Sequence, residues 1–395
     1  MAATHLSGGD SAPSTKVQWT TPAQPGEITI DPAEVTTSRI KITWTAPATG
    51  GTETYRVSIS PEHGGNTPAS VSSSTLEHTF NGLTAGTEYN IRVVAVSSGG
   101  DSVERTKVQW TTPAQPGEIT IGAVTVSSIP ITWAAPATGG TETYRVSISP
   151  EHGGNTPASV SSSTLEHTFN GLTAGTEYNI RVVAVSSGGD SAPSTKVQWT
   201  IAAQPGDITI TEVTVNSVKA AWVASAGNVQ RYTVSISPTT DVPNPSQDIT
   251  NLNALEHTFT GLTAGTLYTI SVIAKSGGTD STDSTKQQRT RPSPPGDINQ
   301  PTDDMVTTTN ITVTWGPSPG GEFSGYEVIF TLVEGGVVLT TVEVDSGTTT
   351  ASEPSALSPG QLYLIEVYAV SGTGNNRMES DRKNITTPML LRTLL

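Results

Sequence analysis

Apolar and polar residues alternate along short runs throughout this chain. In the run 39–44 the apolar positions are Ile40, Ile42 and Trp44, and the run 55–59 follows the same period of two. Such alternation predicts β-strands that bury one face. Segments rich in glycine, proline and serine separate the runs and predict turns. Apolar spacing of three and four never continues long enough for a helix, so we expect an all-β protein built of antiparallel sandwiches.

The pattern repeats along the chain. A tryptophan that ends one run recurs after 89, 89 and 93 residues, and the motif Leu-x-x-Gly-x-x-Tyr follows it each time. Residues 46–102 and 135–191 are identical over all 57 positions. Such a spacing is typical of one small domain per copy, so we predict four tandem domains. The aromatic residues of the two markers are predicted core residues: Trp44, Tyr89, Trp133, Tyr178, Trp222, Tyr268, Trp315 and Tyr363.

Proline-rich connectors lead into a Pro-Gly pair at the start of each copy, and they predict short, semi-stiff linkers. Residues 7–20 match residues 187–200 position for position, so we expect them to be the closing loop and last strand of a truncated upstream copy. The chain is then a fragment of a longer protein. The predicted segments are 1–20 (the truncated copy), 21–113, 114–202, 203–292 and 293–388 (the four domains), and 389–395 (a tail).

The strand-ending tryptophan, the tyrosine of the run 55–59 and the Leu-x-x-Gly-x-x-Tyr motif together resemble the fibronectin type III domain family over residues 21–388. The resemblance implies four seven-stranded, immunoglobulin-like β-sandwiches arranged like beads on a string. It implies that Trp44 fills the core of its domain and that Tyr89 forms a corner. It also implies a structural role, since such domains serve mostly as spacers and binding surfaces in adhesion molecules, matrix proteins and receptor ectodomains and are not enzymes.

A strand of each of the first three copies carries a histidine two residues before a phenylalanine, as at His78 and Phe80. One histidine per domain does not build a metal site, so we expect partly buried strand histidines. The fourth copy departs from the pattern, because alignment places Ser352 and Pro354 at the positions of His78 and Phe80, and we expect this strand to differ. The histidines are His78, His167 and His257.

Composition narrows the classes of partner. The chain of 395 residues carries 35 acidic and 20 basic residues, a net charge of −15, which excludes the clustered basic surface that nucleic acids require. It has no cysteine, which excludes disulfides and cysteine-ligated zinc. No apolar run approaches the roughly 20 residues that cross a bilayer, so we expect no direct membrane insertion. The first ten residues lack the charged and apolar regions of a signal peptide.

The candidate binding residues lie in loops. The closing loop of the first copy resembles the integrin-binding Arg-Gly-Asp-Ser loop of fibronectin, but a glycine stands at the position of the arginine in both identical copies. Two interpretations remain, a protein-binding loop that keeps its carboxylate and a turn selected for backbone freedom. The candidate binding residues are Gly99, Gly100, Asp101, Ser102, Gly188, Gly189, Asp190 and Ser191.

A tryptophan ends the last strand of three copies, at Trp19, Trp110 and Trp199, and Arg289 and Ile385 take this position in the third and fourth domains. A deep core site does not readily accept arginine, so the position is peripheral. The tryptophan either caps the edge of the core or packs against the neighbouring domain.

Two Asn-x-Thr sequons, at Asn310 and Asn384, are candidate glycosylation sites in the fourth copy. Alternation with the neighbouring apolar residues turns both asparagines outward, as a glycan requires. The sequons support a secretory route.

The sequence therefore predicts a non-enzymatic array, with no catalytic, metal-binding or cofactor-binding residue. We expect a modular spacer and protein-binding array from an extracellular matrix or cell-surface adhesion protein, whose partners are other proteins. Two alternatives remain, the ectodomain of a receptor such as a receptor-type tyrosine phosphatase and an accessory array of a secreted polysaccharide hydrolase. All three interpretations place the chain outside the cell.

Overall fold

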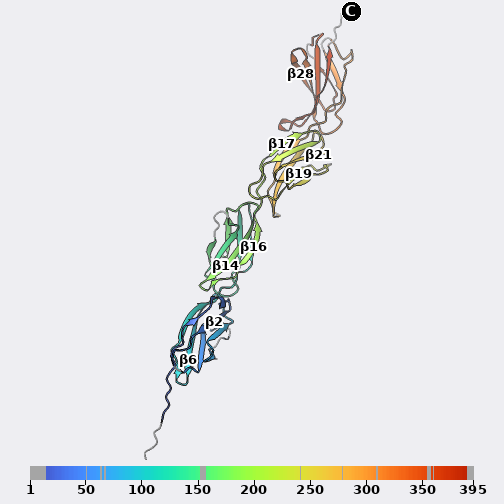
Figure 1. The fold of residues 1–395 in the computed structure, drawn as a ribbon. Coiled ribbons are helices and arrows are strands. Elements are labelled where there is room, and N and C mark those ends of the chain that lie inside the picture. Colours follow the sequence, from blue (N-terminus) through green and yellow to red (C-terminus); the bar gives the residue numbers. More distant parts are fainter. Residues whose placement is uncertain are drawn as a thin grey trace, which may run out of the picture. The chain divides into compact units, whose positions relative to one another are not determined.

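A computed structural model describes residues 15–49, 51–62, 65, 68–151, 157–240, 242–277, 279–307, 310–353, 357–358 and 360–388. It contains four tandem β-sandwich domains (Figure 1). One compact unit contains the first domain and most of the second, and the other contains the last two domains together with residues 125–127, 172–177 and 199–202 of the second. Residues 15–20 form no regular element. The predicted tail 389–395 and residues 1–14 of the predicted upstream remnant lie outside the described residues.

The strands are short, and three turns of 3-10 helix accompany them. The first domain contains β1 (Ile28–Thr29), η1 (Pro32–Glu34), β2 (Arg39–Trp44), β3 (Thr54–Ser60), β4 (Ala69–Ser72), β5 (Glu77–Asn81), β6 (Glu88–Ser97), β7 (Gly100–Asp101) and β8 (Arg105–Trp110). The second domain contains β9 (Ile119–Ile121), β10 (Ser128–Trp133), β11 (Thr143–Ser149), β12 (Ala158–Ser161), β13 (Glu166–Asn170), β14 (Glu177–Ser186), β15 (Gly189–Asp190) and β16 (Ser194–Trp199).

The same order of strands continues in the second unit. The third domain contains β17 (Ile208–Val213), β18 (Ser217–Trp222), β19 (Arg231–Ser237), β20 (Ser246–Ile249), β21 (Glu256–Thr260), β22 (Leu267–Ser276), β23 (Thr279–Asp280) and β24 (Ser284–Arg289). The fourth domain contains β25 (Ile298–Asn299), β26 (Ile311–Trp315), β27 (Gly325–Leu332), η2 (Glu334–Gly336), β28 (Val337–Asp345), β29 (Thr350–Glu353), β30 (Leu362–Ser371), η3 (Gly374–Asn376), β31 (Met378–Glu379) and β32 (Lys383–Pro388).

Each domain packs a three-stranded sheet on a five-stranded sheet, and all strand pairs are antiparallel. In the first domain the sheets are β1-β2-β5 and β4-β3-β6-β7, and β8 also pairs with β6. The predicted seventh strand is thus split into β7 and β8. The split follows from Ser102, whose backbone N–H donates to the carbonyl of Ala95 while its hydroxyl accepts from the Ala95 N–H. A side chain therefore replaces one backbone partner, and the ladder is interrupted there.

The alternating stripe of the sequence is the core of each domain. Along β2, Ile40, Ile42 and Trp44 are at most 3% exposed, whereas the residues between them are exposed or half-buried. The indole of Trp44 packs edge-to-face on the Tyr55 ring of the opposite sheet, with ring centroids 5.3 Å apart. The eight aromatic residues predicted for the cores are all at most 5% exposed. Burying such a side chain contributes roughly 1.5–3 kcal/mol.

A buried tyrosine fixes the corner before the sixth strand. The backbone N–H of Thr84 donates to the Tyr89 hydroxyl over 2.9 Å, and the equivalent bonds run from Thr263 to Tyr268 and from Ser358 to Tyr363. The corner holds the segment that enters β6 in place. It thereby positions the loop residues that reach the next domain.

In strand β29 of the fourth domain, the pairing differs by one residue from the alignment that placed Ser352 at the position of His78. Ala351, and not Ser352, pairs with Val313 of β26, as His78 pairs with Ile42 in the first domain. Ala351 is 6% exposed, so the small methyl group takes the inward position. Ser352 turns to the other face, where its hydroxyl hydrogen-bonds Thr312 over 2.8 Å. Pro354 lies outside the described residues.

The histidines of the other three domains are half-buried beside phenylalanine. The ring of His78 meets the ring of Phe80 edge-on at a centroid distance of 4.7 Å, and His167 and His257 repeat the contact. Burial lowers the pKa of each histidine below its usual value, because the charged ring loses hydration.

Acidification is expected to destabilise these three domains. The unfolded chain protonates its histidines near pH 6.5, above the lowered pKa of the folded state, so stability is present above that pH and is lost as the pH falls through it. Calorimetry of the whole chain at pH 7.5 and at pH 5.5 measures the loss. Replacing the three histidines by glutamine is expected to remove part of it. The fourth domain contains no histidine and provides the internal control, and an equal response of all four domains contradicts the assignment.

Candidate protein-binding surface

The candidate binding loop of the first domain is a tight hairpin between β6 and β7. Ser97 pairs with Gly100, and Gly100 has a φ of 111°, which favours glycine. Ser98 at the tip donates to the Glu53 carboxylate from its backbone N–H at 2.8 Å and from its hydroxyl at 2.6 Å. These bonds lower the pKa of Glu53. The second domain repeats the anchor with Ser187 and Glu142.

The carboxylate and the hydroxyl of the loop both have partners. Asp101 forms an ion pair with Arg56 of β3, and each side chain is 46% exposed. Asp190 and Arg145 form the same pair in the second domain. Ser102 is 8% exposed and bonds the backbone on both sides, and Ser191 is 7% exposed. The part of the loop that presents charge to solvent is therefore an Asp–Arg pair on the outer face of the five-stranded sheet.

The glycine that replaces arginine lies against the end of the preceding domain. A Cβ at Gly188 would overlap the carbonyl oxygen of Thr111 and lie 3.0 Å from the Cβ of Trp110. A Cβ at Gly99 would overlap the carbonyl oxygen of Thr20 in the same way. The position admits no side chain, and this contact explains why an arginine is absent there. Trp110 is thus half-buried at the junction between the first two domains, which supports the second interpretation of this position.

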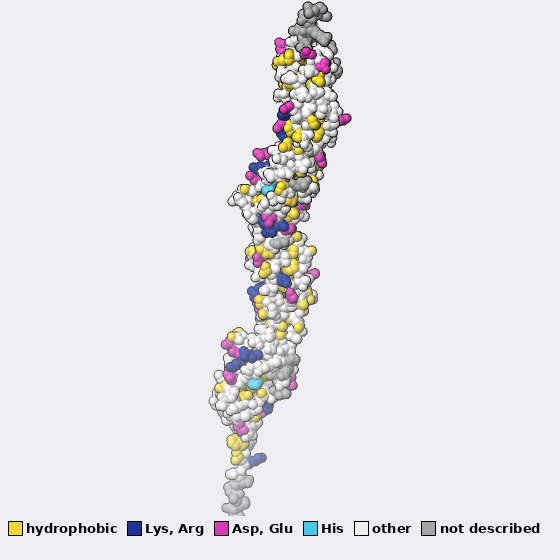
Figure 2. All heavy atoms as spheres, turned by 90° about the vertical axis from the view of Figure 1, so that its right-hand side faces the viewer, with side chains coloured by type: hydrophobic (Ala, Val, Ile, Leu, Met, Phe, Trp, Pro, Cys, Tyr) yellow, Lys and Arg dark blue, Asp and Glu magenta, His cyan; other side chains and the backbone are white. Residues whose placement is uncertain are grey.

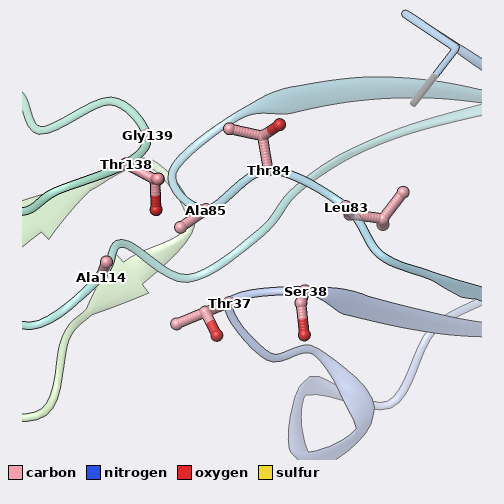
Figure 3. A pocket seen from close by; sticks show the side chains of 8 residues that line it. All are labelled: Thr37, Ser38, Leu83, Thr84, Ala85, Ala114, Thr138 and Gly139. Carbon is pink, nitrogen blue, oxygen red and sulfur yellow. The ribbon is translucent and has the colours of Figure 1, made fainter. Parts of the chain in front are cut away.

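A second contact of the same junction joins the corner before β6 to the loop between β10 and β11. Gly140 donates its N–H to the carbonyl oxygen of Ala85 at 3.3 Å. A Cβ at Gly140 would lie 2.7 Å from the carbonyl oxygen of Gly86. Figure 3 shows Ala85 of the first domain close to Thr138 and Gly139 of the second. On this side of the junction the two domains therefore contact each other through backbone atoms.

Beside this contact lies a shallow hollow of about 500 Å³ (Figure 3). Its lining offers methyl and hydroxyl groups and no charged side chain. The lining residues are Thr37, Ser38, Leu83, Thr84, Ala85, Ala114, Thr138 and Gly139. Such a lining gives a small ligand no fixed charge to bind, so the hollow is best described as part of the junction.

The junction between the third and fourth domains has the same geometry and a different chemistry. Glu322 donates its N–H to the carbonyl oxygen of Ala264 at 2.9 Å, as Gly140 does to Ala85. Arg289 stands at the position of Trp110, with its Nε 2.8 Å from the place of a Cβ on Gly372. In the fourth domain the structure corrects the assignment of Ile385 to this position, because Pro388 pairs with Leu362 as Trp110 pairs with Glu88. Ion pairs join Arg289 to Glu322 at 3.7 Å and Arg291 to Asp381 at 3.3 Å. No ion pair crosses the junction of the first two domains within the described part of the chain.

The two sequons differ in exposure. Asn384 lies on β32 and is exposed, as is Thr386 of the same sequon. Asn310 is half-buried at the start of β26, and its Oδ1 is enclosed without a hydrogen-bond partner among the described residues. Of the two, Asn384 has the geometry of a glycan acceptor, and its modification stays a prediction.

One Gly-x-Ser-x-Gly sequence, the pattern of a nucleophile elbow, occurs at 316–320. It lies in the loop between β26 and β27, and the backbone N–H of Ser318 donates to the Tyr326 hydroxyl at 2.8 Å. An elbow requires a turn from a strand into an α-helix and a nearby histidine, whereas residues 316–320 join two strands and the sequence of this domain contains no histidine.

Metal binding and membrane spanning are two further properties that side chains and helices would reveal. In the described ranges no three histidine, aspartate or glutamate side chains gather closely enough to hold a metal ion. No helix of these ranges has the length and apolar character of a membrane span.

Comparison with known proteins defines the family. The model of the fibronectin type III domain matches residues 23–112, 114–200, 203–290 and 293–385, so the chain belongs to the fibronectin type III family. Tenascin from Gallus gallus is 27% identical over 76% of this chain and 16% of its own length. Tenascin-R from Gallus gallus is 28% identical over 79% of the chain and 22% of its own length. Receptor-type tyrosine-protein phosphatase eta from Gallus gallus is 27% identical over 87% of the chain and 24% of its own length.

The chain therefore spans no more than about a quarter of the length of these relatives. The family assignment from the tryptophan and tyrosine markers is confirmed. The assignment of the closing loops to partner binding stays a prediction. The signal that sequence reasoning missed is the pair of glycines in the loop 135–142, which marks a backbone contact with the first domain.

Adding one methyl group at the junction between the first and second domains is expected to loosen that junction. Gly140→Ala forces the loop away from Gly86, at a cost of about 1–3 kcal/mol in the unfolding free energy of the chain. Gly51, the identical position of the first domain, has open space around its Cβ site, so Gly51→Ala is the matched control and changes stability by less than about 0.5 kcal/mol. The chain lacks cysteine, so introduced cysteines in the first two domains can carry dyes for energy transfer. Equal inter-dye distance distributions for both variants contradict the interlocked junction.

Salt is expected to loosen the junction between the third and fourth domains and to leave the junction between the first two domains unchanged. Screening of the pairs Arg289–Glu322 and Arg291–Asp381 weakens contacts of about 0.2–1 kcal/mol each. Raising sodium chloride from about 50 mM to about 500 mM therefore broadens the energy-transfer distribution between the third and fourth domains, and Asp381→Asn does so at low salt. The first junction, with its apolar and backbone contacts, serves as the control. A response of similar size at both junctions refutes the assignment.

Proposed function

We propose that this chain is a non-enzymatic array of fibronectin type III domains that sets the spacing between parts of an extracellular matrix or cell-surface adhesion protein. The observation that carries the proposal is the use of loop glycines at the junctions. Gly188 meets Trp110 and Gly140 meets Gly86, so loops at the end of the second sandwich hold the first domain. In an array joined in this way, the position of one domain constrains the position of the next.

Under this proposal, partner proteins meet the sides of the domains. The ends are occupied at the junctions, whereas the outer faces and edges of both sheets stay accessible. The pairs Asp101–Arg56 and Asp190–Arg145 lie on such a face, and they are the part of the closing loops that a partner contacts. The surplus of acidic residues favours partners with basic surfaces.

A receptor ectodomain is the second candidate. A match to a receptor-type tyrosine-protein phosphatase over 87% of this chain favours it. The same junctions would then hold the array between a ligand and a membrane anchor elsewhere in the protein. Both candidates share the extracellular location, which the exposed sequon at Asn384 also supports.

The extracellular assignment predicts a glycan at one position. When the chain is secreted from a glycosylating cell behind an added leader, its intact mass is expected to carry one N-glycan at Asn384, because that side chain lies exposed on β32. Asn384→Gln removes the added mass. Asn310→Gln is the control and is expected to leave it unchanged, because Asn310 is half-buried. A secreted chain without any glycan argues against the role of Asn384 and weakens the extracellular assignment.

A further inference from the structure

The edge strand β28 of the five-stranded sheet is unusual in the fourth domain. Its counterparts β4, β12 and β20 contain four residues each, whereas β28 contains nine. β28 stands at the edge of its sheet, which has the order β28-β27-β30-β31. No other strand pairs with its outer side among the residues that the structure describes. A long strand in this position offers a row of backbone donors and acceptors to an incoming strand.

One end of β28 is apolar and exposed. Val337, Val338 and Leu339 are 53%, 57% and 40% exposed. Val333, 45% exposed, donates its backbone N–H to the carbonyl of Leu362, which is 41% exposed, so both lie at the same end of the sheet. Figure 2 shows hydrophobic side chains on the surface of this domain. Elsewhere in the described chain, large exposed apolar residues occur singly or in pairs.

The other end of β28 is acidic and lines a hollow of about 530 Å³. Glu343 pairs directly with Glu327 of β27, which places two like charges side by side. The nearby cation, Arg377, is already bound to Glu327 and Glu379. Glu327 also accepts a hydrogen bond from Tyr368, and burial together with Glu327 raises the pKa of that tyrosine to about 12.

Glu343 and Asp345 line the same hollow, and neither forms an ion pair within the described residues. The hollow and its rim thus hold four carboxylates, at 327, 343, 345 and 379, against a single guanidinium. This end of the strand therefore carries more negative than positive charge.

We propose that the edge of β28 binds an extended, basic and apolar segment of a partner protein as an added antiparallel strand. Backbone hydrogen bonds then supply affinity, and side chains on alternate positions supply specificity. A second copy of the chain fits poorly, since antiparallel self-pairing about Thr341 places Leu339 opposite Glu343, and each copy carries a charge of −15. The proposal adds a partner class to the array function and is tested independently of the junctions.

The register of β28 defines the order of residues in the partner. Thr341 pairs with Ile329 and Glu343 with Glu327, so the side chains of 341, 343 and 345 share the outer face. The antiparallel partner meets the acidic end first and the apolar end last. A segment of the form basic-apolar-basic-apolar-Thr-apolar satisfies the charges and extends both faces of the sheet.

The test is a titration of the whole chain with the dye-labelled peptide acetyl-Lys-Val-Arg-Val-Thr-Val-amide. We expect saturable binding by fluorescence anisotropy and slower amide hydrogen exchange in residues 340–345, which the six residues of the peptide pair with in this register. The charge-reversed peptide acetyl-Glu-Val-Glu-Val-Thr-Val-amide is expected not to bind. The double variant Glu343→Lys/Asp345→Lys is expected to weaken binding about tenfold, since two exposed ion pairs are lost.

The control variant Glu62→Lys/Glu151→Lys makes the same change of net charge in the first two domains, where both side chains are exposed, and is expected to bind the peptide as the parent does. Unchanged melting of both double variants shows that they fold. Equal affinity for the two peptides, or protection outside 337–345, overturns the proposal. Self-association that protects 337–345 in the absence of peptide overturns it in favour of a second copy.

Discussion

Consecutive domains approach so closely at two junctions that the backbone leaves no room for a side chain. At Gly140 and Gly188 of the second domain, a single added carbon would collide with the carbonyl oxygens of Gly86 and Thr111. The glycine at the place of the arginine in the resembling adhesion loop is therefore a packing requirement. With glycine at this position, the tip of the loop packs against the neighbouring domain and presents no charged side chain. The remaining charge of the loop lies on the face of the sheet, in the Asp190–Arg145 ion pair.

The junction between the first two domains and the junction between the last two have the same geometry but are held by different interactions. Between the first two domains, Trp110 and backbone groups make contacts that salt does not screen. Between the last two, Arg289 takes the place of the tryptophan, and ion pairs to Glu322 and Asp381 cross the junction. Arginine is tolerated because the position is at the edge of the core, where its stem packs and its guanidinium reaches oxygen acceptors. Stiffness along an array of similar folds can thus vary from one junction to the next.

The fourth domain has diverged most from the other three. Its edge strand β28 is more than twice as long as the equivalents, exposes three successive apolar residues and ends in two carboxylates that form no ion pair within the described residues. Sheet edges of soluble proteins are usually shortened or protected because they attract other strands. An edge that combines length, apolar side chains and like charges is better suited to a partner of opposite charge. The junctions provide spacing, and this domain provides a place for recognition.

The sequence by itself determined the fold, because alternation with a period of two and the repeated Trp and Tyr markers fix which side chains are buried. It also determined the family and the number of domains. It left the position of Trp110 open and misplaced Ser352 by one residue, since the local pattern near Ala351 lacks the large apolar residue that sets the register elsewhere. Only the tertiary structure decided what the loop glycines contact, which sequon is exposed and where carboxylates lack partners. Such contacts join residues far apart in sequence, and no local period encodes them.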